Sequence, residues 1–346
     1  MTMTWIVGFT LDGCELAVKI SEMLKEGECR IYRRTSLSII GTEEITGSMS
    51  DWMEQAFKNC DSLIFVGATG IAVRYIAPHL KSKTTDPAVI CIDERGKFVI
   101  PLVSGHIGGA NDLAIRISKF IDSTPVITTA TDINGKFSVD SYAVRHDMEI
   151  ENVSMVKTVS SNILAGKPVE ILSEFPLENI PSELNSNDKG DVGIYISCRT
   201  ENGPFNKTLK LIPRCHVLGI GCRKGIPVKK IEEFVFDTLK ENDISPKSLR
   251  TIASIDLKKD EKGLLEFGER NHLPCVFFTS DELSELSDIG YSRSEFVLAV
   301  TGVENVCERS AIAASRNGKI ILKKTIGDGI TMSIVQDNIS FDLGDT

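Results

Sequence analysis

The feature that most constrains the fold of this chain is a recurring unit: a short apolar run, a glycine-rich turn and a helical pattern follow one another. The run at 62–66 ends in Gly67-Ala68-Thr69-Gly70, and the helical spacing of 71–80 comes next. The run at 98–103 leads into a turn with three glycines, and the helical pattern of 110–121 follows. Apolar runs of this length, bounded by turns, are typical of buried strands. Strands that alternate with helices form layered structures, so we expect an α/β protein with mostly parallel sheets.

The same pattern divides the chain into three parts. Its 346 residues suffice for about two to three domains. We expect an N-terminal three-layer α/β domain at 1–130 and a C-terminal α/β domain at 214–346, where the unit recurs. Between them, 131–213 has the pattern of a small middle module, because its polar stretch at 176–191 predicts a long loop.

Two local predictions bear on where functional residues lie. The apolar runs 88–93 and 97–103 flank Glu94-Arg95-Gly96, which predicts a hairpin. Nearer the C-terminus, the apolar run 296–300 predicts a strand that ends in Thr301-Gly302, and the spacing over 303–314 predicts the helix that follows.

Composition excludes several classes of partner and location. The formal net charge is −9, from 39 basic and 48 acidic residues, so we expect no broad surface for nucleic acid or anionic membranes. No apolar run reaches about 18 residues, and the N-terminus lacks the basic and apolar regions of a signal peptide. The nine cysteines include no Cys-x-x-Cys pair, which favours reduced thiols and a cytoplasmic protein.

One cluster in the sequence has the residue types of a metal site. Cys215, His216 and Cys222 lie close together, but no fourth ligand is obvious and the segment has the pattern of an apolar strand. We therefore expect no protein-bound metal. Cys222 as a nucleophile has no evident catalytic histidine as its partner in the sequence, so buried packing is the expected role of its thiol.

The first glycine turn has the features of an anion site. Small residues such as Gly67 and Gly70 let backbone N–H groups approach a ligand at a helix N-terminus, and Thr69 adds a hydroxyl. Arg74, one helical turn later, suits a carboxylate. The alternative is an ordinary glycine turn with a surface arginine. Ligands in open α/β sheets gather at the carboxyl ends of strands, which favours the functional interpretation.

The second turn is the more informative, because it contains an ionisable side chain. His106 titrates near neutral pH and suits general acid–base work, and Asn111 both donates and accepts hydrogen bonds. The alternative is a histidine that satisfies a backbone carbonyl. No Gly-x-Ser-x-Gly motif supports a nucleophilic serine, and no Walker or Gly-x-Gly-x-x-Gly motif supports a nucleotide. The predicted binding residues of this turn are Ser104, Gly105, Gly108, Gly109 and Asn111.

Short polar residues follow the next apolar run. Thr129 and Asp132, with Asn134 and Asp140 beyond them, either line the same cleft as the second turn or are turn residues leaving the first domain.

The C-terminal part repeats the pattern of small residues followed by cations. Gly221 and Cys222 precede the cations Arg223 and Lys224, and Thr301-Gly302 opens the expected helix. On that helix, Glu308 is followed by small residues and either faces solvent or points into a cleft.

Taken together, these motifs resemble the cobalt-precorrin-5A hydrolase family of anaerobic cobalamin biosynthesis. The resemblance rests on the segments 67–78, 86–89, 101–111, 128–132, 218–225 and 301–311, and it covers most of the chain. The motif Pro-Leu-Val-Ser-Gly-His-Ile-Gly-Gly-Ala-Asn at 101–111 is the most specific. We expect a stand-alone member without a fused second enzyme.

The resemblance implies a function. The family opens the δ-lactone of cobalt-precorrin-5A, cleaves a carbon–carbon bond and releases acetaldehyde to give cobalt-precorrin-5B. It implies no cofactor, because the cobalt arrives inside the substrate. It leaves open transient contact with neighbouring pathway methyltransferases.

On this basis we expect His106 to activate water, Gly108 and Gly109 to hold the oxyanion, and His106 or Glu308 to manage later proton transfers. Arg74, Arg223 and Lys224 are the expected partners of the substrate's carboxylates, in a cleft between the N- and C-terminal domains. The alternatives are a non-catalytic tetrapyrrole-binding carrier of the same pathway and, with less support, an esterase using Ser104 or Cys222.

Overall fold

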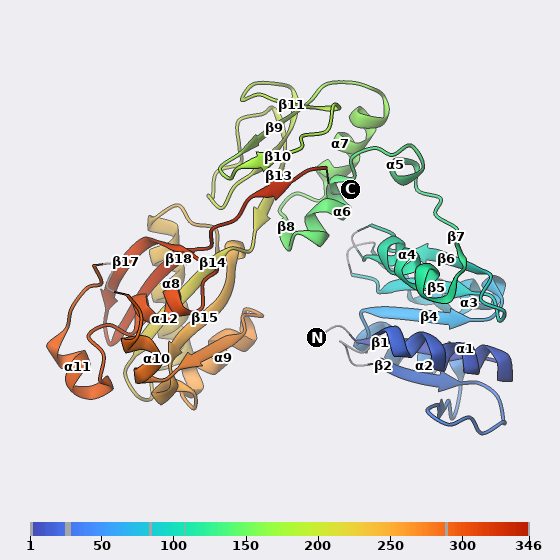
Figure 1. The fold of residues 1–346 in the computed structure, drawn as a ribbon, viewed down its shortest axis with the longest axis horizontal. Coiled ribbons are helices and arrows are strands. Elements are labelled where there is room, and N and C mark those ends of the chain that lie inside the picture. The colour runs from blue at the N-terminus through green and yellow to red at the C-terminus, as the bar shows by residue number, and fades with distance from the viewer. Residues whose placement is uncertain (1–2, 25–28, 83–84, 107, 288–289, 345–346) are drawn as a thin grey trace. The chain divides into compact units, whose positions relative to one another are not determined.

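A computed structural model describes residues 3–24, 29–82, 85–106, 108–287 and 290–344 (Figure 1). The chain forms two compact units, Met1–Val144 and Arg145–Thr346. No described helix is long and apolar enough to cross a membrane. The predicted α/β class is confirmed, since helices cover parallel-rich sheets in both units.

The described part of the first unit is built on one sheet of order β3-β2-β1-β4-β5-β6-β7. Neighbouring strands are parallel at every step except between β5 and β6. The strands are β1 (Thr4–Gly8), β2 (Cys29–Arg33), β3 (Glu43–Glu44), β4 (Ser62–Val66), β5 (Ala88–Ile92), β6 (Phe98–Val103) and β7 (Thr124–Pro125).

Helices cover both faces of this sheet, because its central strands are apolar on both sides. Successive side chains of a strand point to opposite faces. Leu63 and Phe65 pack with α2 and α3, whereas Ile64 and Val66 pack with α1 and α4. The helices of this part are α1 (Leu11–Ser21), η1 (Glu22–Leu24), α2 (Met49–Asn59), α3 (Thr69–Ile76), η2 (Ala77–His79), α4 (Ala110–Ile121), α5 (Ala130–Ile133) and α6 (Val139–Arg145).

The β5–β6 hairpin reverses the direction of the chain within the sheet. Val89, near the start of β5, lies opposite Val103 at the end of β6, and Ile92 lies opposite Val99. The end of β6 therefore lies at the edge where β4 and β5 begin. The strand β7 pairs with the first two residues of β6 and runs parallel to it, so the segment after β7 continues towards that same edge.

In its described residues, the second unit has two five-stranded sheets and one pair of short strands. The first has the order β11-β9-β12-β13-β8 and is parallel except for β8. Its elements are β8 (Met148–Ile150), α7 (Ser154–Leu164), β9 (Val169–Ser173), β11 (Leu184–Ser186), β12 (Val192–Ile196) and β13 (Lys207–Pro213). Two further short strands, β10 (Leu177–Glu178) and β19 (Phe341–Asp342), pair in parallel, so the C-terminal segment returns to this part of the chain.

The second sheet has the order β16-β15-β14-β18-β17, and β14 follows β13 almost directly. Gly219 of β14 lets helix α12 lie close to the sheet, since a Cβ there would sit 2.8 Å from the carbonyl carbon of Cys307. The elements are β14 (His216–Cys222), α8 (Val228–Glu241), η3 (Pro246–Ser248), β15 (Leu249–Ile255), η4 (Asp256–Lys258), α9 (Lys262–Arg270), β16 (Cys275–Phe278), α10 (Ser280–Ser284), α11 (Glu295–Thr301), α12 (Cys307–Ala313), β17 (Lys319–Gly327) and β18 (Ile330–Gln336).

The strand predicted at 296–300 is wrong, because this segment belongs to helix α11. Ser294 caps the helix by accepting a hydrogen bond from the Val297 N–H, and Gly302 ends it with a φ of 78°. Thr301-Gly302 therefore closes one helix instead of opening the next, which begins only at Cys307. A short apolar run alone does not distinguish a buried strand from a short helix.

Candidate active site

The His106 turn is held in shape by backbone contacts that only small residues permit. Ser104 has a φ of 57° and its hydroxyl donates to the carbonyl oxygen of Asp86 at 3.0 Å. Gly108 lies against Ser104, and a Cβ at Gly108 would stand 2.8 Å from the Ser104 carbonyl oxygen. The small residues of this turn therefore permit a close approach of backbone to backbone.

The N-terminus of helix α4 is already bonded by the turn. The Gly109 N–H donates to the His106 carbonyl at 2.9 Å, the Ala110 N–H to Ser104 at 3.1 Å, and the Asn111 N–H to Gly105 at 2.9 Å. The Gly109 N–H is thus not available to hold an oxyanion, and that expectation is wrong for Gly109. The turn uses these N–H groups to fix the position of the histidine.

The His106 ring lies between a carboxylate and a hydroxyl. Its Nδ1 is 3.2 Å from Oδ1 and 3.3 Å from Oδ2 of Asp140, and its Nε2 is 3.3 Å from Oγ1 of Thr131. The His106 side chain keeps 16% of its exposure, whereas Asp140 keeps 4% as a residue. A buried carboxylate behind a partly exposed imidazole is the arrangement that orients a general base.

Asp140 is further fixed by its neighbours on the same segment. Its Oδ1 accepts hydrogen bonds from the Ser138 hydroxyl at 3.0 Å and the Ser141 N–H at 3.2 Å. Burial raises the pKa of Asp140, but the hydrogen bond and charge of His106, with the Ser138 hydroxyl, outweigh burial and hold this pKa below its usual value. The carboxylate is therefore ionised at neutral pH.

The segment after β7 reaches the His106 turn because β7 runs parallel to β6, so the chain beyond Pro125 continues towards the edge where β6 ends. The Asn111 side chain donates to the Thr129 hydroxyl at 2.8 Å, and Thr131 contacts His106. The structure thus brings Thr129 together with the second glycine turn. The side chain of Asp132 lies outside the described residues. Thr131 belongs to the polar segment 128–132 named from the sequence, whereas no sequence motif singles out Ser138.

The first glycine turn lies at the opposite edge of the sheet. Gly67 follows the end of β4, whereas Ser104 follows β6, whose end lies beside the start of β5. The length of a strand, about 13 Å for β4, separates the two edges. The two turns therefore do not share one edge of the sheet. Thr69 contacts the Cys91 thiol at 3.6 Å, Gly70 is exposed, and Arg74 is exposed on α3.

The third turn carries exposed cations in the second unit. Gly221 and Cys222 end β14, and the exposed Arg223 lies 3.6 Å from the Asp328 carboxylate. Lys224 is exposed. Burial raises the pKa of Cys222 to about 11, so the thiolate that a nucleophile needs is disfavoured at neutral pH.

Glu308 is fully enclosed by hydrogen-bond donors. Its Oε1 accepts from the Ser292 hydroxyl at 3.0 Å and the Lys324 N–H at 2.7 Å. Its Oε2 accepts from the Ser292 N–H at 2.7 Å and the Asn305 side chain at 2.8 Å. The residue is 1% exposed. This geometry favours a structural role, in which the Glu308 carboxylate links helix α12 to the loop at Ser292 and to strand β17.

The fold does not bring together the three possible metal ligands named from the sequence, Cys215, His216 and Cys222. Cys222 lies at the far end of β14 from His216, while Cys198 joins Cys215 and His216 in one buried cluster. The Sγ atoms of Cys198 and Cys215 are 3.5 Å apart. Burial lowers the pKa of His216 to about 4, so this imidazole is neutral at physiological pH.

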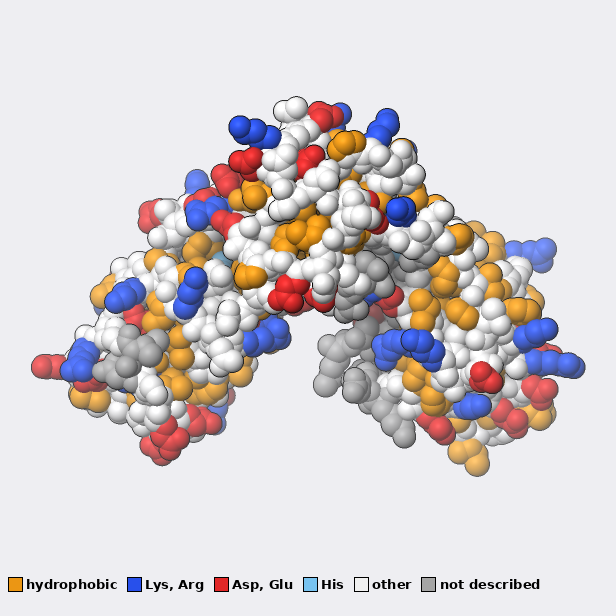
Figure 2. All heavy atoms as spheres, turned by 45° about the horizontal axis from the view of Figure 1, so that its top comes forward, with side chains coloured by type: hydrophobic (Ala, Val, Ile, Leu, Met, Phe, Trp, Pro, Cys, Tyr) orange, Lys and Arg blue, Asp and Glu red, His pale blue; other side chains and the backbone are white. Residues whose placement is uncertain are grey.

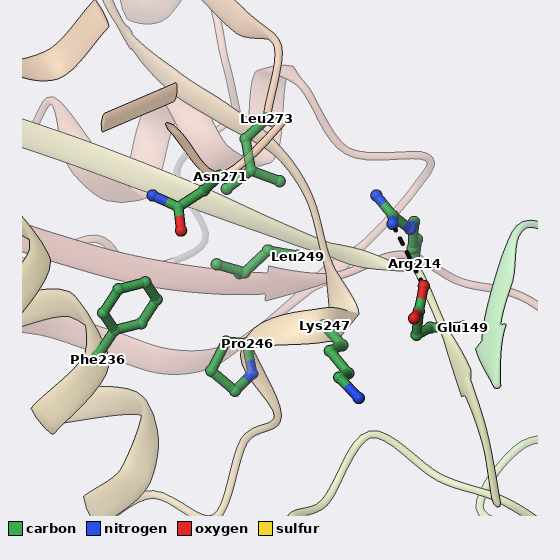
Figure 3. Close-up of a pocket in the computed structure, with 8 residues that line it drawn as sticks. All are labelled: Glu149, Arg214, Phe236, Pro246, Lys247, Leu249, Asn271 and Leu273. Atoms are coloured by element: carbon green, nitrogen blue, oxygen red, sulfur yellow. Dashed lines mark ion pairs between the residues drawn. The ribbon is translucent and has the colours of Figure 1, made fainter. Parts of the chain in front are cut away.

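A separate cavity of about 240 Å³ lies in the second unit (Figure 3). Leu249, Leu273 and Phe236 line its apolar side, while Arg214 pairs with Glu149 at 3.6 Å on the other. None of the predicted site residues lines it. On the face drawn in Figure 2, acidic and basic side chains are interspersed over the surface.

Comparison with known proteins decides the family. Residues 51–132 match the family model described as Cobalamin synthesis G N-terminal, 137–213 match Cobalamin biosynthesis central region, and 216–335 match Cobalamin synthesis G C-terminus. A cobalt-precorrin-5A hydrolase from Salmonella typhimurium is 32% identical to this chain, over 94% of the chain and 95% of that protein. The chain belongs to the cobalt-precorrin-5A hydrolase family. The resemblance inferred from the motifs is thereby confirmed.

Other members of the family are similar over comparable lengths. The cobalt-precorrin-5A hydrolase from Priestia megaterium is 28% identical over 95% of this chain and 93% of that protein. A crystal structure described as a cobalamin biosynthesis protein G homolog from Sulfolobus solfataricus matches 96% of each chain, at 24% identity and a TM-score of 0.43.

Proposed function

We propose that this protein hydrolyses cobalt-precorrin-5A, opening its δ-lactone and releasing acetaldehyde to give cobalt-precorrin-5B. Family membership supports the substrate, because relatives over almost the whole chain bear that enzyme's name. The observation that carries the chemistry is the contact of His106 with the buried Asp140 at 3.2 Å. The cobalt belongs to the substrate, and we propose no further cofactor, since each step below is a proton transfer or a bond heterolysis.

His106 acts as the general base in the first step. Its Nδ1–H donates to Asp140, so Nε2, which contacts the Thr131 hydroxyl at 3.3 Å, is the nitrogen that accepts a proton from water. The resulting hydroxide adds to the lactone carbonyl, and the tetrahedral intermediate collapses with cleavage of the ring C–O bond. One product group is a carboxylic acid, which releases its proton to solvent and becomes a carboxylate. The other is the alkoxide of a two-carbon substituent, which the His106 imidazolium protonates.

The second step breaks the carbon–carbon bond. His106 takes back the hydroxyl proton, the C–O bond becomes the carbonyl of acetaldehyde, and the bonding electrons pass into the conjugated macrocycle. The macrocycle is then protonated, so the sum of both steps consumes one water and releases one acetaldehyde. In this mechanism His106 alone carries out the proton transfers, so no catalytic role is assigned to Glu308. Glu308 keeps the structural role that its four hydrogen-bond donors indicate.

Two further groups assist at the same turn. The Thr131 hydroxyl, 3.3 Å from Nε2, is placed to hold the attacking water beside the base. The Gly108 N–H stays the proposed donor to the oxyanion. Arg74, Arg223 and Lys224 are exposed cations, and we propose that they bind peripheral carboxylates of the macrocycle.

The test is anaerobic incubation of the protein with cobalt-precorrin-5A, with trapping of acetaldehyde and measurement of the product mass. We expect one acetaldehyde per substrate and a product mass that matches loss of this fragment and gain of water. Binding of the tetrapyrrole without acetaldehyde would instead support the alternative, a non-catalytic carrier of the same pathway. A covalent adduct at Ser104 or Cys222 with an active-ester probe would support the esterase alternative.

A further inference from the structure

The cluster of Cys198, Cys215 and His216 lies away from the proposed active site and has no role in it. The cysteines follow the carboxyl ends of β12 and β13, which are parallel neighbours in one sheet. His216 begins β14, the first strand of the next sheet. The cluster therefore stands where the chain passes from one sheet of the second unit to the other.

We propose that Cys198, Cys215 and His216 bind one thiophilic divalent metal ion, of which Zn²⁺ is the physiological representative. One ligand atom from each residue lies within 4.8 Å of the other two. Two sulfurs and an imidazole nitrogen are the donors that zinc prefers. The three residues keep 6%, 1% and 2% of their exposure, so a metal bound there would be shielded from bulk water.

The sulfur separation fits a metal better than a disulfide. Two sulfurs bound to one tetrahedral Zn²⁺ at about 2.3 Å stand about 3.8 Å apart, whereas a disulfide needs about 2.05 Å. The Sγ atoms of Cys198 and Cys215 are 3.5 Å apart. The separation of the two sulfurs therefore changes by about 0.3 Å for a metal, but by about 1.5 Å for a disulfide.

The charge balance also suits a buried site. Each thiol releases its proton on binding, so two thiolates and one divalent cation sum to zero charge, and the neutral imidazole adds none. An uncharged cluster avoids the cost of burying a net charge. The fully buried Ser248 hydroxyl donates to the Ser245 carbonyl at 2.6 Å and contacts His216 Nδ1 at 2.8 Å, so it fixes the orientation of the imidazole, as partners of metal-binding histidines do.

The site would join the two sheets of the second unit. The Cys215 N–H already donates to the Ser248 carbonyl at 3.0 Å, and the Ser245 N–H donates to the Cys198 carbonyl at 2.7 Å. A metal would add a stronger link at the same junction. This role is structural and independent of turnover at His106, so the proposal stands or falls separately from the proposed reaction.

The test uses the full chain, prepared under reducing conditions, treated with chelator and then titrated with Co²⁺ and Zn²⁺. We expect one Co²⁺ per chain with an intense thiolate-to-metal charge-transfer band, and displacement of Co²⁺ by Zn²⁺. Absence of stoichiometric binding by the wild-type protein would overturn the proposal without recourse to any variant.

Variants assign the ligands. Cys198→Ser and Cys215→Ser should each weaken binding by more than about 100-fold, while Cys275→Ser, a half-buried cysteine on β16, should leave it unchanged. Equal binding by all three variants would overturn the assignment. Loss of two hydrogen atoms in the intact mass on mild oxidation, together with no metal uptake by the reduced chain, would show a disulfide pair instead.

Discussion

Asp140→Asn tests the central geometry most sharply among single substitutions at the site. The change preserves the size of the side chain but removes the negative charge that holds the His106 Nδ1–H at 3.2 Å. A hydrogen bond to a charged group contributes about 1.5–3 kcal/mol. If that stabilisation applies to the imidazolium formed in the transition state, kcat falls about 10- to 150-fold, since 1.4 kcal/mol is a factor of ten.

Asp140 is 4% exposed and lies behind the imidazole, so its substitution should change kcat far more than KM. The assay is steady-state acetaldehyde release from cobalt-precorrin-5A under anaerobic conditions, over a range of pH. Asp122→Asn is the matched control. It makes the same chemical change in the same unit, at an exposed position whose φ of 57° asparagine tolerates, and should keep wild-type kcat.

A kcat for Asp140→Asn within about twofold of wild type would refute the reasoning, because the hydrogen bond would then contribute almost nothing. An equal loss of kcat in Asp122→Asn would refute it as well. Thermal unfolding of each variant separates a loss of turnover from a loss of fold.

Three other predictions concern the stability of the fold. Glu308→Gln should lower the free energy of unfolding by about 2–4 kcal/mol, because four buried donors lose a charged acceptor. Urea unfolding and activity assays check this. A variant that is as stable as wild type but does not turn over would instead indicate a catalytic role for Glu308. Gly219→Ala should lower the free energy of unfolding by about 3 kcal/mol or more, since its Cβ would overlap the Cys307 carbonyl. Gly70→Ala, whose Cβ would have nothing within 4 Å, should leave the stability of the protein unchanged. Equal urea midpoints for the two variants would contradict this. The lowered pKa of Asp140 means that its carboxylate stabilises the folded state fully above about pH 4 and progressively less as the pH falls towards that lowered value. The difference in unfolding free energy between wild type and Asp140→Asn should therefore shrink in acid, and growth of that difference would contradict the sign.

Local patterns predicted the elements well where periodicity and turn residues agreed. The strand at 62–66 and the helix at 110–121 have the predicted bounds, and the hairpin around Gly96 is present. The segment at 296–300 failed because five apolar residues fit either a strand or a short helix, and the capping role of Ser294 was overlooked.

The site is harder to predict, because it depends on the directions of the strands and on contacts between residues that lie far apart in the sequence. The predicted hairpin itself implies that β6 runs antiparallel to β5 and ends at the opposite edge of the sheet from the end of β4. Asp140 lies 34 positions from His106, so no local spacing signals their contact. Cys198 meets Cys215 only because β12 and β13 are neighbours in the sheet. Because β6 runs antiparallel to β5, the hairpin pattern in the sequence could have predicted that the Thr129 segment lies beside the His106 turn.

The most direct test of the central claim compares turnover and binding for His106→Gln. The amide keeps much of the imidazole's size but does not act as a base near neutral pH. The account predicts that acetaldehyde release falls by at least about 100-fold, as expected for loss of a general base, while the dissociation constant for cobalt-precorrin-5A changes little. Release of acetaldehyde at the wild-type rate by His106→Gln would contradict the account.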